Sequence, residues 1–303
     1  MTYLSAHWSF GPVMALVAAV VVAHEWGLAR LARRATPAHE RGRRRRAWLF
    51  YGGLALLVVS IDSPLDYWAG SYFFVHMIDH VVAAFFVPIL IVAGAPWVPL
   101  LFALPVRARR RLMRAVIREP RWAWLRSVGR VAGHPWTAVV SFNASMLAWH
   151  VPALFEFSER NAWAHVVLMH GSFLVTGTLF WLQIIPSHPW RPRRGPAFQI
   201  GAILATNAIM TLLAISMSIL TTTSWYPSYD HVPGVTLPAF ADQQIGAAIL
   251  WVCGDFWALP SLALLLRRVI ESEGSVSEAF EHWRQHTALA STEVRRAADV
   301  VEP

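Results

Sequence analysis

Long apolar stretches constrain the fold of this chain more than any other feature of its sequence. They cover residues 8–29, 47–61, 73–95, 136–151, 163–185, 198–220 and 243–266. Crossing the hydrocarbon core of a membrane takes about 20 apolar residues in a helix, which satisfies its own backbone hydrogen bonds there. The chain is therefore predicted to be an all-α polytopic membrane helix bundle with about seven transmembrane helices, or about six if the short second stretch is only interfacial.

The arginines set the predicted orientation. All 26 basic residues are arginine. Arg30–Arg46 and Arg107–Arg130 follow the first and third stretches, whereas Arg160 is the single arginine predicted on the opposite side. Because cytoplasmic loops are rich in arginine, the N-terminus is predicted outside and the C-terminus in the cytoplasm. Residues 1–266 would form the transmembrane bundle and residues 267–303 a cytoplasmic C-terminal tail.

The two predicted sides differ in the partners that they suit. The arginine run at residues 41–46 is expected to contact anionic membrane lipid and not nucleic acid. The outer side holds Asp62, Asp66, Asp79, Glu156, Glu159, Asp230 and Asp242. An acidic mouth would draw cations inward. The alternative is that acids tolerate translocation across the membrane better than arginine does.

Five histidines crowd the predicted outer edge of the bundle. They come from three different apolar stretches and are His76, His80, His150, His165 and His170. Ionisable side chains inside a bilayer are costly, so a layer of them at one depth indicates a functional site. Imidazole is also the commonest metal ligand in proteins. A metal or redox site is the leading hypothesis.

The spacing of these histidines indicates which of them face each other. His76 and His80 are one helical turn apart, and Asp79 lies close enough in rotation to bind an ion or to orient an imidazole. His165 and His170 are separated by about 140° on an α-helix and are not expected to face one ion together. His170 is favoured as the inward residue and His165 as an entry ligand. Each histidine could instead be a hydrogen-bonded core residue.

The other candidates carry a weaker signal. His150 ends its stretch at the same level and is either a ligand or an interface anchor. Met217 offers a thioether, which beside imidazole favours Cu(I), although methionine is also an ordinary packing residue. Asp242 either guides a cation or suits the dipole of its own helix. Cys253 is the single cysteine, which excludes a Cys-x-x-Cys or Cys-x-Cys clamp within the chain.

Several motifs follow one another in a fixed order. Asp62-Ser63-Pro64-Leu65-Asp66 precedes the turn His76-Met77-x-x-His80, and Pro88 and Gly94-Ala95-Pro96 follow it. Then come Trp149-His150, a helix with His170, Gly177 and Phe180-Trp181, and finally Asp242-Gln243-Gln244-Ile245-Gly246 before Trp251. Over about residues 45–266, this order resembles the CtaG-type cytochrome c oxidase assembly factor family, whose members are multi-span proteins of bacterial membranes.

The resemblance implies a multi-pass protein of the bacterial cytoplasmic membrane that is needed to mature a haem-copper oxidase. It also implies a set of candidate site residues, which are His76, His80, His150 and His170 with Asp242 as the acid of the last helix. His165 fits this set less closely. The implied partner is the catalytic subunit of the oxidase, and the copper donor is not identified.

We therefore expect an assembly factor and not an enzyme. This factor would take up copper at an outward-facing site and pass it to the oxidase subunit. His76, His80 and His170 would be the primary ligands, and His150 and Met217 secondary ones. Asp79 would orient an imidazole, while Asp62, Asp66 and Asp242 would attract the cation.

Two alternatives belong to other classes of protein. A haem-b electron-transfer protein would use axial histidines from facing helices. A proton or cation conductor would use Asp255 with the histidines. The conductor is the weakest reading, because the inner halves of the third and fifth stretches are almost wholly apolar.

Overall fold

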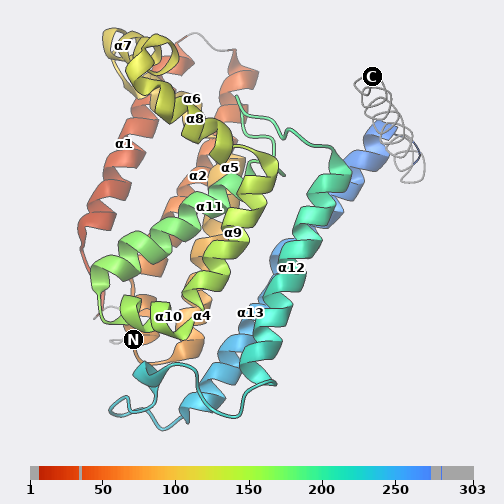
Figure 1. The fold of residues 1–303 in the computed structure, drawn as a ribbon. Coiled ribbons are helices and arrows are strands. Elements are labelled where there is room, and N and C mark those ends of the chain that lie inside the picture. The colour runs from red at the N-terminus through yellow and green to blue at the C-terminus, as the bar shows by residue number, and fades with distance from the viewer. Residues whose placement is uncertain (1–6, 34–35, 274–280, 282–303) are drawn as a thin grey trace, which may run out of the picture.

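The computed structural model describes residues 7–33, 36–273 and 281, and this part of the chain is all-α without a β-strand. The prediction of an all-α bundle is confirmed for these residues. Figure 1 shows long helices running side by side between two ends of the molecule. Helix α10 lies near one end, and α7 lies at the other.

Five helices of the described part are long and apolar enough to cross a membrane, or up to six if one bent pair counts as a span. Two of the five are compound helices with a π-helical segment, namely Phe73–Gly94 and Ala164–Trp181. The elements are α1 (Pro12–Ala32), α4 (Phe73–Val81), η1 (Val82–Phe86), α5 (Val87–Gly94), η3 (Ala164–His170), α11 (Gly171–Trp181), α12 (Pro196–Ser218) and α13 (Ala239–Glu273).

The remaining predicted spans depart from a straight apolar helix. The helices α9 (Pro135–Trp149) and α10 (Pro152–Glu159) meet at an angle of 74°. Pro152 lies at this break, where it cannot donate the backbone hydrogen bond of a continuous helix. Helix α2 (Pro37–Asp62) includes the arginine run in its first half and the apolar stretch in its second half. It is one continuous helix of 26 residues.

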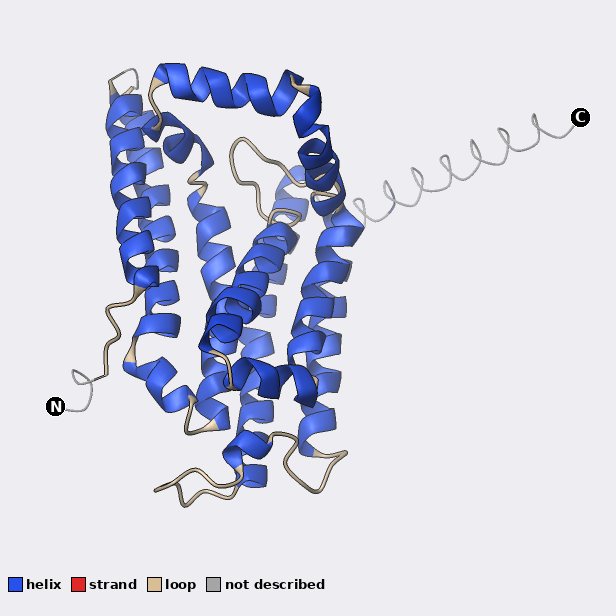
Figure 2. Cartoon of the chain, turned by 60° about the vertical axis from the view of Figure 1, so that its left-hand side comes forward, coloured by secondary structure: helices blue, strands red, loops and turns tan. Residues whose placement is uncertain are grey.

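Short helices cap the two ends of the bundle. The end with α6 (Trp97–Ala103), α7 (Val106–Arg118), η2 (Pro120–Trp122) and α8 (Ala123–Ala132) is called the arginine-rich end here. Figure 2 shows a helix lying across this end, roughly perpendicular to the long helices. At the opposite end lie α3 (Pro64–Ala69), α10 and the loop of residues 219–238, which contains η4 (Pro227–Tyr229). The arginine-rich segments and the predicted histidine site therefore lie at opposite ends.

The helices approach each other closely where glycine replaces a side chain. A Cβ atom on Gly27 of α1 would lie 1.8 Å from the carbonyl oxygen of Pro99 in α6. A Cβ atom on Gly94 of α5 would lie 2.8 Å from the backbone nitrogen of Phe50 in α2. Backbone cannot move aside as a flexible side chain can, so the first contact fixes α1 against α6 and the second fixes α5 against α2.

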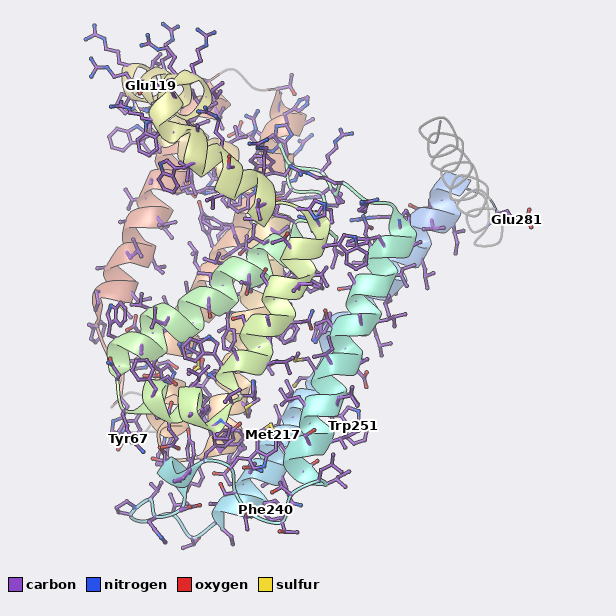
Figure 3. All side chains as sticks on the ribbon, viewed as in Figure 1. Tyr67, Glu119, Met217, Phe240, Trp251 and Glu281 are labelled. Atoms are coloured by element: carbon purple, nitrogen blue, oxygen red, sulfur yellow. The ribbon has the colours of Figure 1, made fainter. Side chains whose placement is uncertain are left out.

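The inside and the outside of the bundle are both apolar. Phe85 packs in its centre between Phe142 and Trp257, whose ring centroids lie 5.2 and 4.7 Å from its own, respectively. On the outside, Phe256 and Leu212 are exposed, and Trp251 points away from the bundle (Figure 3). A soluble protein rarely exposes so much apolar surface, whereas a membrane solvates it. The exposed faces therefore support a membrane protein.

Candidate metal centre

Helix α4 carries three members of the predicted site on one buried face. His76, Asp79 and His80 are at most 1% exposed. Their spacing of three and four residues brings them to one side of the helix, and the ring centroids of the two histidines are 4.1 Å apart. Both imidazoles point into the bundle, as the spacing predicts.

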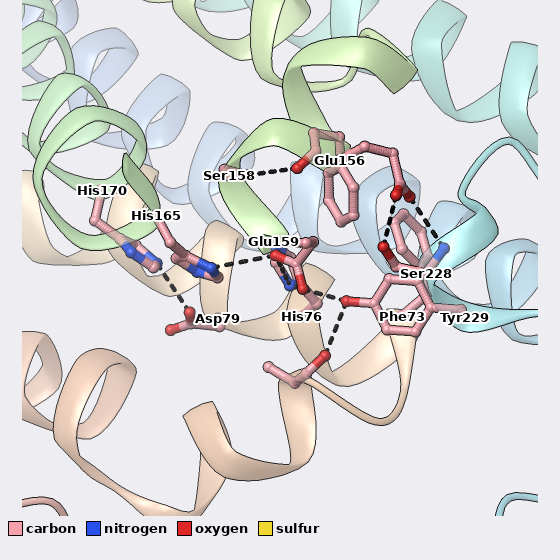
Figure 4. Close-up of polar contacts among 12 residues, drawn as sticks. Phe73, His76, Asp79, Glu156, Ser158, Glu159, His165, His170, Ser228 and Tyr229 are labelled. Carbon is pink, nitrogen blue, oxygen red and sulfur yellow. Dashed lines mark hydrogen bonds and ion pairs between the residues drawn. The ribbon is translucent and has the colours of Figure 1, made fainter. Parts of the chain in front are cut away.

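A π-helix changes the geometry of the next two histidines. His165 and His170 lie in η3, where hydrogen bonds between residues five apart place such residues one above the other. Their rings stack with centroids 4.8 Å apart and an interplanar angle of 26°. The expectation that they could not face one ion is wrong, because it assumed an α-helix. The ring of His165 lies 5.1 Å from that of His76 (Figure 4), and the ring of His170 lies 5.7 Å from that of His80, measured between centroids.

The described residues form two overlapping groups of donor atoms that could hold a metal ion. His76, His80 and His165 make one group, and Asp79, His165 and His170 make the other. Within each group the donor atoms lie within 4.8 Å of one another, and His165 belongs to both. Zinc or copper ligation needs donors about 2 Å from a common point. Closure around an ion therefore asks for side-chain movements of roughly 1 Å.

Several buried ring nitrogens in this layer have no hydrogen-bond partner among the described residues, as metal-ligating atoms would. The described residues offer no hydrogen-bond partner to His76 Nε2, to either ring nitrogen of His80, to His165 Nε2 or to His170 Nδ1. A buried polar atom without a partner costs about 1–3 kcal/mol. Several such atoms at one place fit a set of imidazole lone pairs that face a cation. The donor set, which is rich in imidazole, suits copper, zinc, iron or nickel.

Two carboxylates hold the histidines in place. Asp79 Oδ2 lies 2.9 Å from His170 Nε2, and both side chains are buried. Glu159 of α10 lies 3.2 Å from His165 Nδ1 and 3.6 Å from His76 Nδ1 (Figure 4). A carboxylate on one ring nitrogen fixes the tautomer and leaves the other nitrogen to bind a metal. Sequence reasoning placed Glu159 only on the acidic outer surface, because α10 reaches the site through the break at Pro152.

Loop 219–238 covers the site at the end of the bundle opposite to the arginine-rich end. The Tyr229 hydroxyl donates to the carbonyl of Ala69 at 2.9 Å and lies 3.1 Å from His76 Nδ1. Tyr226 donates to the carbonyl of His150 at 3.0 Å. Burial, and then the charge of nearby Glu159, holds the pKa of Tyr229 well above its usual value. Tyr229 therefore stays a neutral donor over the physiological range of pH.

His150 lies beside the two groups without belonging to either. Its ring centroid is 6.2 Å from that of His80. Its Nδ1 lies 2.6 Å from the carbonyl oxygen of Met146. Because a carbonyl can only accept, Nδ1 carries the proton and the lone pair is on Nε2, which has no partner among the described residues. His150 thus offers an unpaired nitrogen lone pair close to His80.

Asp242 has a structural contact that the sequence did not predict. Its carboxylate accepts the backbone N–H groups of Phe73 at 2.7 Å and Phe74 at 2.9 Å. These groups belong to the first turn of α4, which has no partner for them within the helix. Asp242 therefore caps α4 and positions His76 and His80. The two sequence-based roles, guiding a cation and suiting the dipole of its own helix, do not include this contact.

The other predicted acids differ in their surroundings. Asp62 is buried at the end of α2, where Oδ1 accepts a hydrogen bond from Ser9 Oγ at 3.0 Å. It ties the N-terminal segment to α2. Asp66 in α3 has its pKa raised to about 6 by burial and then by the charge of Asp79. Asp66 thus lies within electrostatic range of the metal groups, as a cation-attracting residue would.

Met217 and Asp255 lie outside both donor groups. Met217 is buried in the main hydrophobic core, and its backbone carbonyl accepts from Gln243 Nε2 at 2.7 Å. These contacts suit a packing residue. Asp255 is exposed on the outer face of α13. The haem alternative is disfavoured by the ring spacing, since a porphyrin would have to separate imidazoles whose centroids are 4.1 to 5.1 Å apart.

Comparison with known proteins gives matches that cover most of the chain. The family described as cytochrome c oxidase caa3 assembly factor matches residues 22–272. Uncharacterized proteins of Mycobacterium bovis and Mycobacterium tuberculosis are each 32% identical over 257 residues, which is 83% of this chain and 36% of theirs. A protein of Mycobacterium leprae is 30% identical over 214 residues, which is 68% of this chain and 31% of its own. The chain thus spans about a third of the length of these relatives. No solved structure matches it.

Proposed function

The chain belongs to the cytochrome c oxidase caa3 assembly factor family, and from that premise we propose that it binds copper at the histidine layer and delivers it to the catalytic subunit of the oxidase. The family makes it an assembly factor for a cytochrome c oxidase. Copper is the cargo in this proposal, and the chain performs no catalysis on it.

One observation carries the proposal. Buried imidazoles from α4 and η3 form two donor groups, and many of their nitrogen atoms have no partner among the described residues. Imidazole is a good ligand for copper, and an adjacent carboxylate strengthens the ligand and fixes its orientation. His76, His80 and His165 would form one position for the ion, and Asp79, His165 and His170 the other.

The remaining residues would support these positions. Glu159 and Asp66 would attract the cation toward the outer edge of the layer, and Glu159 would also orient His165. Asp242 would act through α4, which it caps. His150 would offer its free Nε2 when the ion leaves His80.

The proposal includes an orientation in the bacterial cytoplasmic membrane. The arginine-rich end would face the cytoplasm, because arginine is retained on that side. The histidine layer would then lie near the outer surface, where a haem-copper oxidase could receive the metal laterally. With α2 and the bent pair of α9 and α10 counted, the bundle of residues 1–266 would cross the membrane seven times. The proposed tail at residues 267–303 lies mostly outside the described residues.

Copper analysis of the purified full chain tests the proposal. The chain is loaded with Cu(I) under reducing conditions, desalted and analysed for metal, beside a His76→Ala/His80→Ala variant. We expect the variant to retain at least about 10-fold less copper, since loss of even an orienting neighbour costs about 10–100-fold in affinity. His188→Ala is the matched control, because His188 is an exposed histidine in the loop before α12. Equal copper in all three proteins would overturn the proposal.

A further inference from the structure

A groove lies between α9 and α12 toward the arginine-rich end, far along the bundle from the histidine layer. Its volume is about 940 Å³. Trp136 and Val139 of α9 form one wall, and Phe198 of α12 forms the other. Trp136 and Phe198 meet edge to face, with centroids 5.1 Å apart. The groove is therefore apolar and is shaped by rigid aromatic side chains.

Small residues of α12 form the floor of this groove. Ala197, Gly201 and Ala205 are four residues apart and lie on one face of the helix. Such a face usually lets another helix approach closely. Apart from Gly201 itself, its chain neighbours and the adjoining backbone of α12, no heavy atom of the described residues lies within 4 Å of where a Cβ atom on Gly201 would be. The space above the small residues is thus open within the described chain.

Two arginines stand at the end of the groove. Arg193 and Arg194 line it directly before α12, and both are exposed. Neither guanidinium forms a salt bridge with a carboxylate of the described residues. The first turn of α12, which begins at Pro196 with Gly195 as its N-cap, adds the positive end of a helix dipole. The groove therefore combines an apolar channel with an uncompensated cationic mouth.

From this combination we infer that the groove binds a phospholipid with an anionic headgroup. The phosphate contacts Arg193 and Arg194, and an acyl chain lies over Gly201 beside the contacting rings of Trp136 and Phe198. Basic pockets between membrane helices are known to suit anionic headgroups. A partner helix fits the space poorly. A spanning helix is about 10–12 Å across and about 30 Å long, so its volume is more than twice that of the groove.

Lipid binding by the purified full chain tests this inference. The protein is delipidated, titrated with phosphatidylglycerol or phosphatidylcholine, and followed by native mass spectrometry. We expect phosphatidylglycerol to bind more tightly, and an Arg193→Gln/Arg194→Gln variant to lose about 30-fold in its affinity, since each arginine near a membrane surface contributes about 1 kcal/mol. An Arg107→Gln/Arg110→Gln variant controls for general attraction, because these exposed arginines lie on α7. It should retain the tight site.

A second variant tests the apolar channel independently of charge. Gly201→Leu places a side chain into open space, so the fold should tolerate it while acyl chains lose their place. We expect tight binding of phosphatidylglycerol to disappear in this variant. Equal affinity for both lipids in the native chain, or unchanged binding in the Arg193→Gln/Arg194→Gln variant, overturns the inference. Capture of a protein segment and not lipid by a photocrosslinker at residue 201 in membranes also overturns it.

Discussion

Two contacts between a carboxylate and a nitrogen-bearing side chain, of nearly equal length, lie in opposite parts of the molecule. His170 and Asp79 are 2.9 Å apart in the histidine layer, where their side chains are 1% and 0% exposed. Arg44 and Glu25 are 2.7 Å apart on α2 and α1, with exposed fractions of 51% and 41%. The shorter contact, between Arg44 and Glu25, is the one that solvent screens more strongly. Burial, and not distance, decides how much each contact matters.

The same contrast separates the two ends as a whole. The arginine-rich end holds many charges, but no residue of α7 or α8 is buried. The histidine layer holds fewer ionisable groups, and most of them are buried within hydrogen-bond distance of another chain segment. Exposed charges can adapt to water or lipid, whereas buried ones are fixed by their neighbours. The layer should therefore respond strongly to single substitutions, and the arginine-rich end weakly.

The largest effect is expected from Asp79→Ala. It leaves the Nε2 atom of His170 buried without a partner, and loss of one member of a buried pair costs about 3 kcal/mol. Unfolding in mixed detergent micelles measures the change in free energy. Asp79→Asn keeps an oxygen that can accept a hydrogen bond and should recover part of the loss. If Asp79→Ala lowers the free energy of unfolding by less than about 0.5 kcal/mol, the buried contact is no more important than the exposed one and the contrast is wrong.

His165→Ala should have the next largest effect, and it sharpens the contrast within the layer. His165 belongs to both donor groups, whereas His76 belongs to one. Removing the shared ligand should lower the affinity for Cu(I) by about 100-fold or more, and His76→Ala should lower it less. Competition with a coloured Cu(I) chelator measures both. Equal losses in the two variants would contradict the shared role.

Asp242→Ala should cost about 1–2 kcal/mol, the usual loss on removing a helix N-cap. Two backbone N–H groups of α4 lose their acceptor, so the helix should fray where it carries His76. Thermal unfolding in detergent measures the stability, and copper retention should fall with it. The control is Asp230→Ala, since Asp230 is an exposed aspartate in the loop of residues 219–238.

Arg44→Ala should have the smallest effect, between about 0 and 1 kcal/mol. Glu25 keeps the Tyr51 hydroxyl, which donates to it at 2.6 Å. High salt should reduce even this change, because exposed pairs are screened. If Arg44→Ala destabilises the protein as much as Asp79→Ala in the same unfolding assay, the comparison between the two pairs fails.

Much of the architecture follows from local sequence patterns. The apolar stretches predict helices, which the structure confirms, and the spacing of His76 and His80 predicts that they share a face. Local signals also carry the family resemblance, which the match over residues 22–272 confirms. These features depend on residues close together in the sequence, where helical periodicity is a sufficient guide.

The parts that could not be predicted depend on helix irregularities or on distant contacts. The π-helix η3 changes the rotation between His165 and His170, and no residue pattern in that stretch signals it. The break at Pro152 turns α10 back so that Glu159 reaches the layer. Asp242 caps a helix that begins 169 residues earlier in the chain. A proline does signal a break, but the direction of the turn depends on tertiary packing.

Because His165 belongs to both donor groups, it limits the number of metal ions that the histidine layer can bind. An imidazole whose Nδ1 faces Glu159 has one lone pair to give, so an ion at either position takes a ligand away from the other. Under the proposed copper function, the chain would carry a single ion at a time, and that ion would step between the positions by exchanging partners around His165 without returning to water. The layer would then act as a relay and not as a store. A second ion would enter only after a client protein had removed the first.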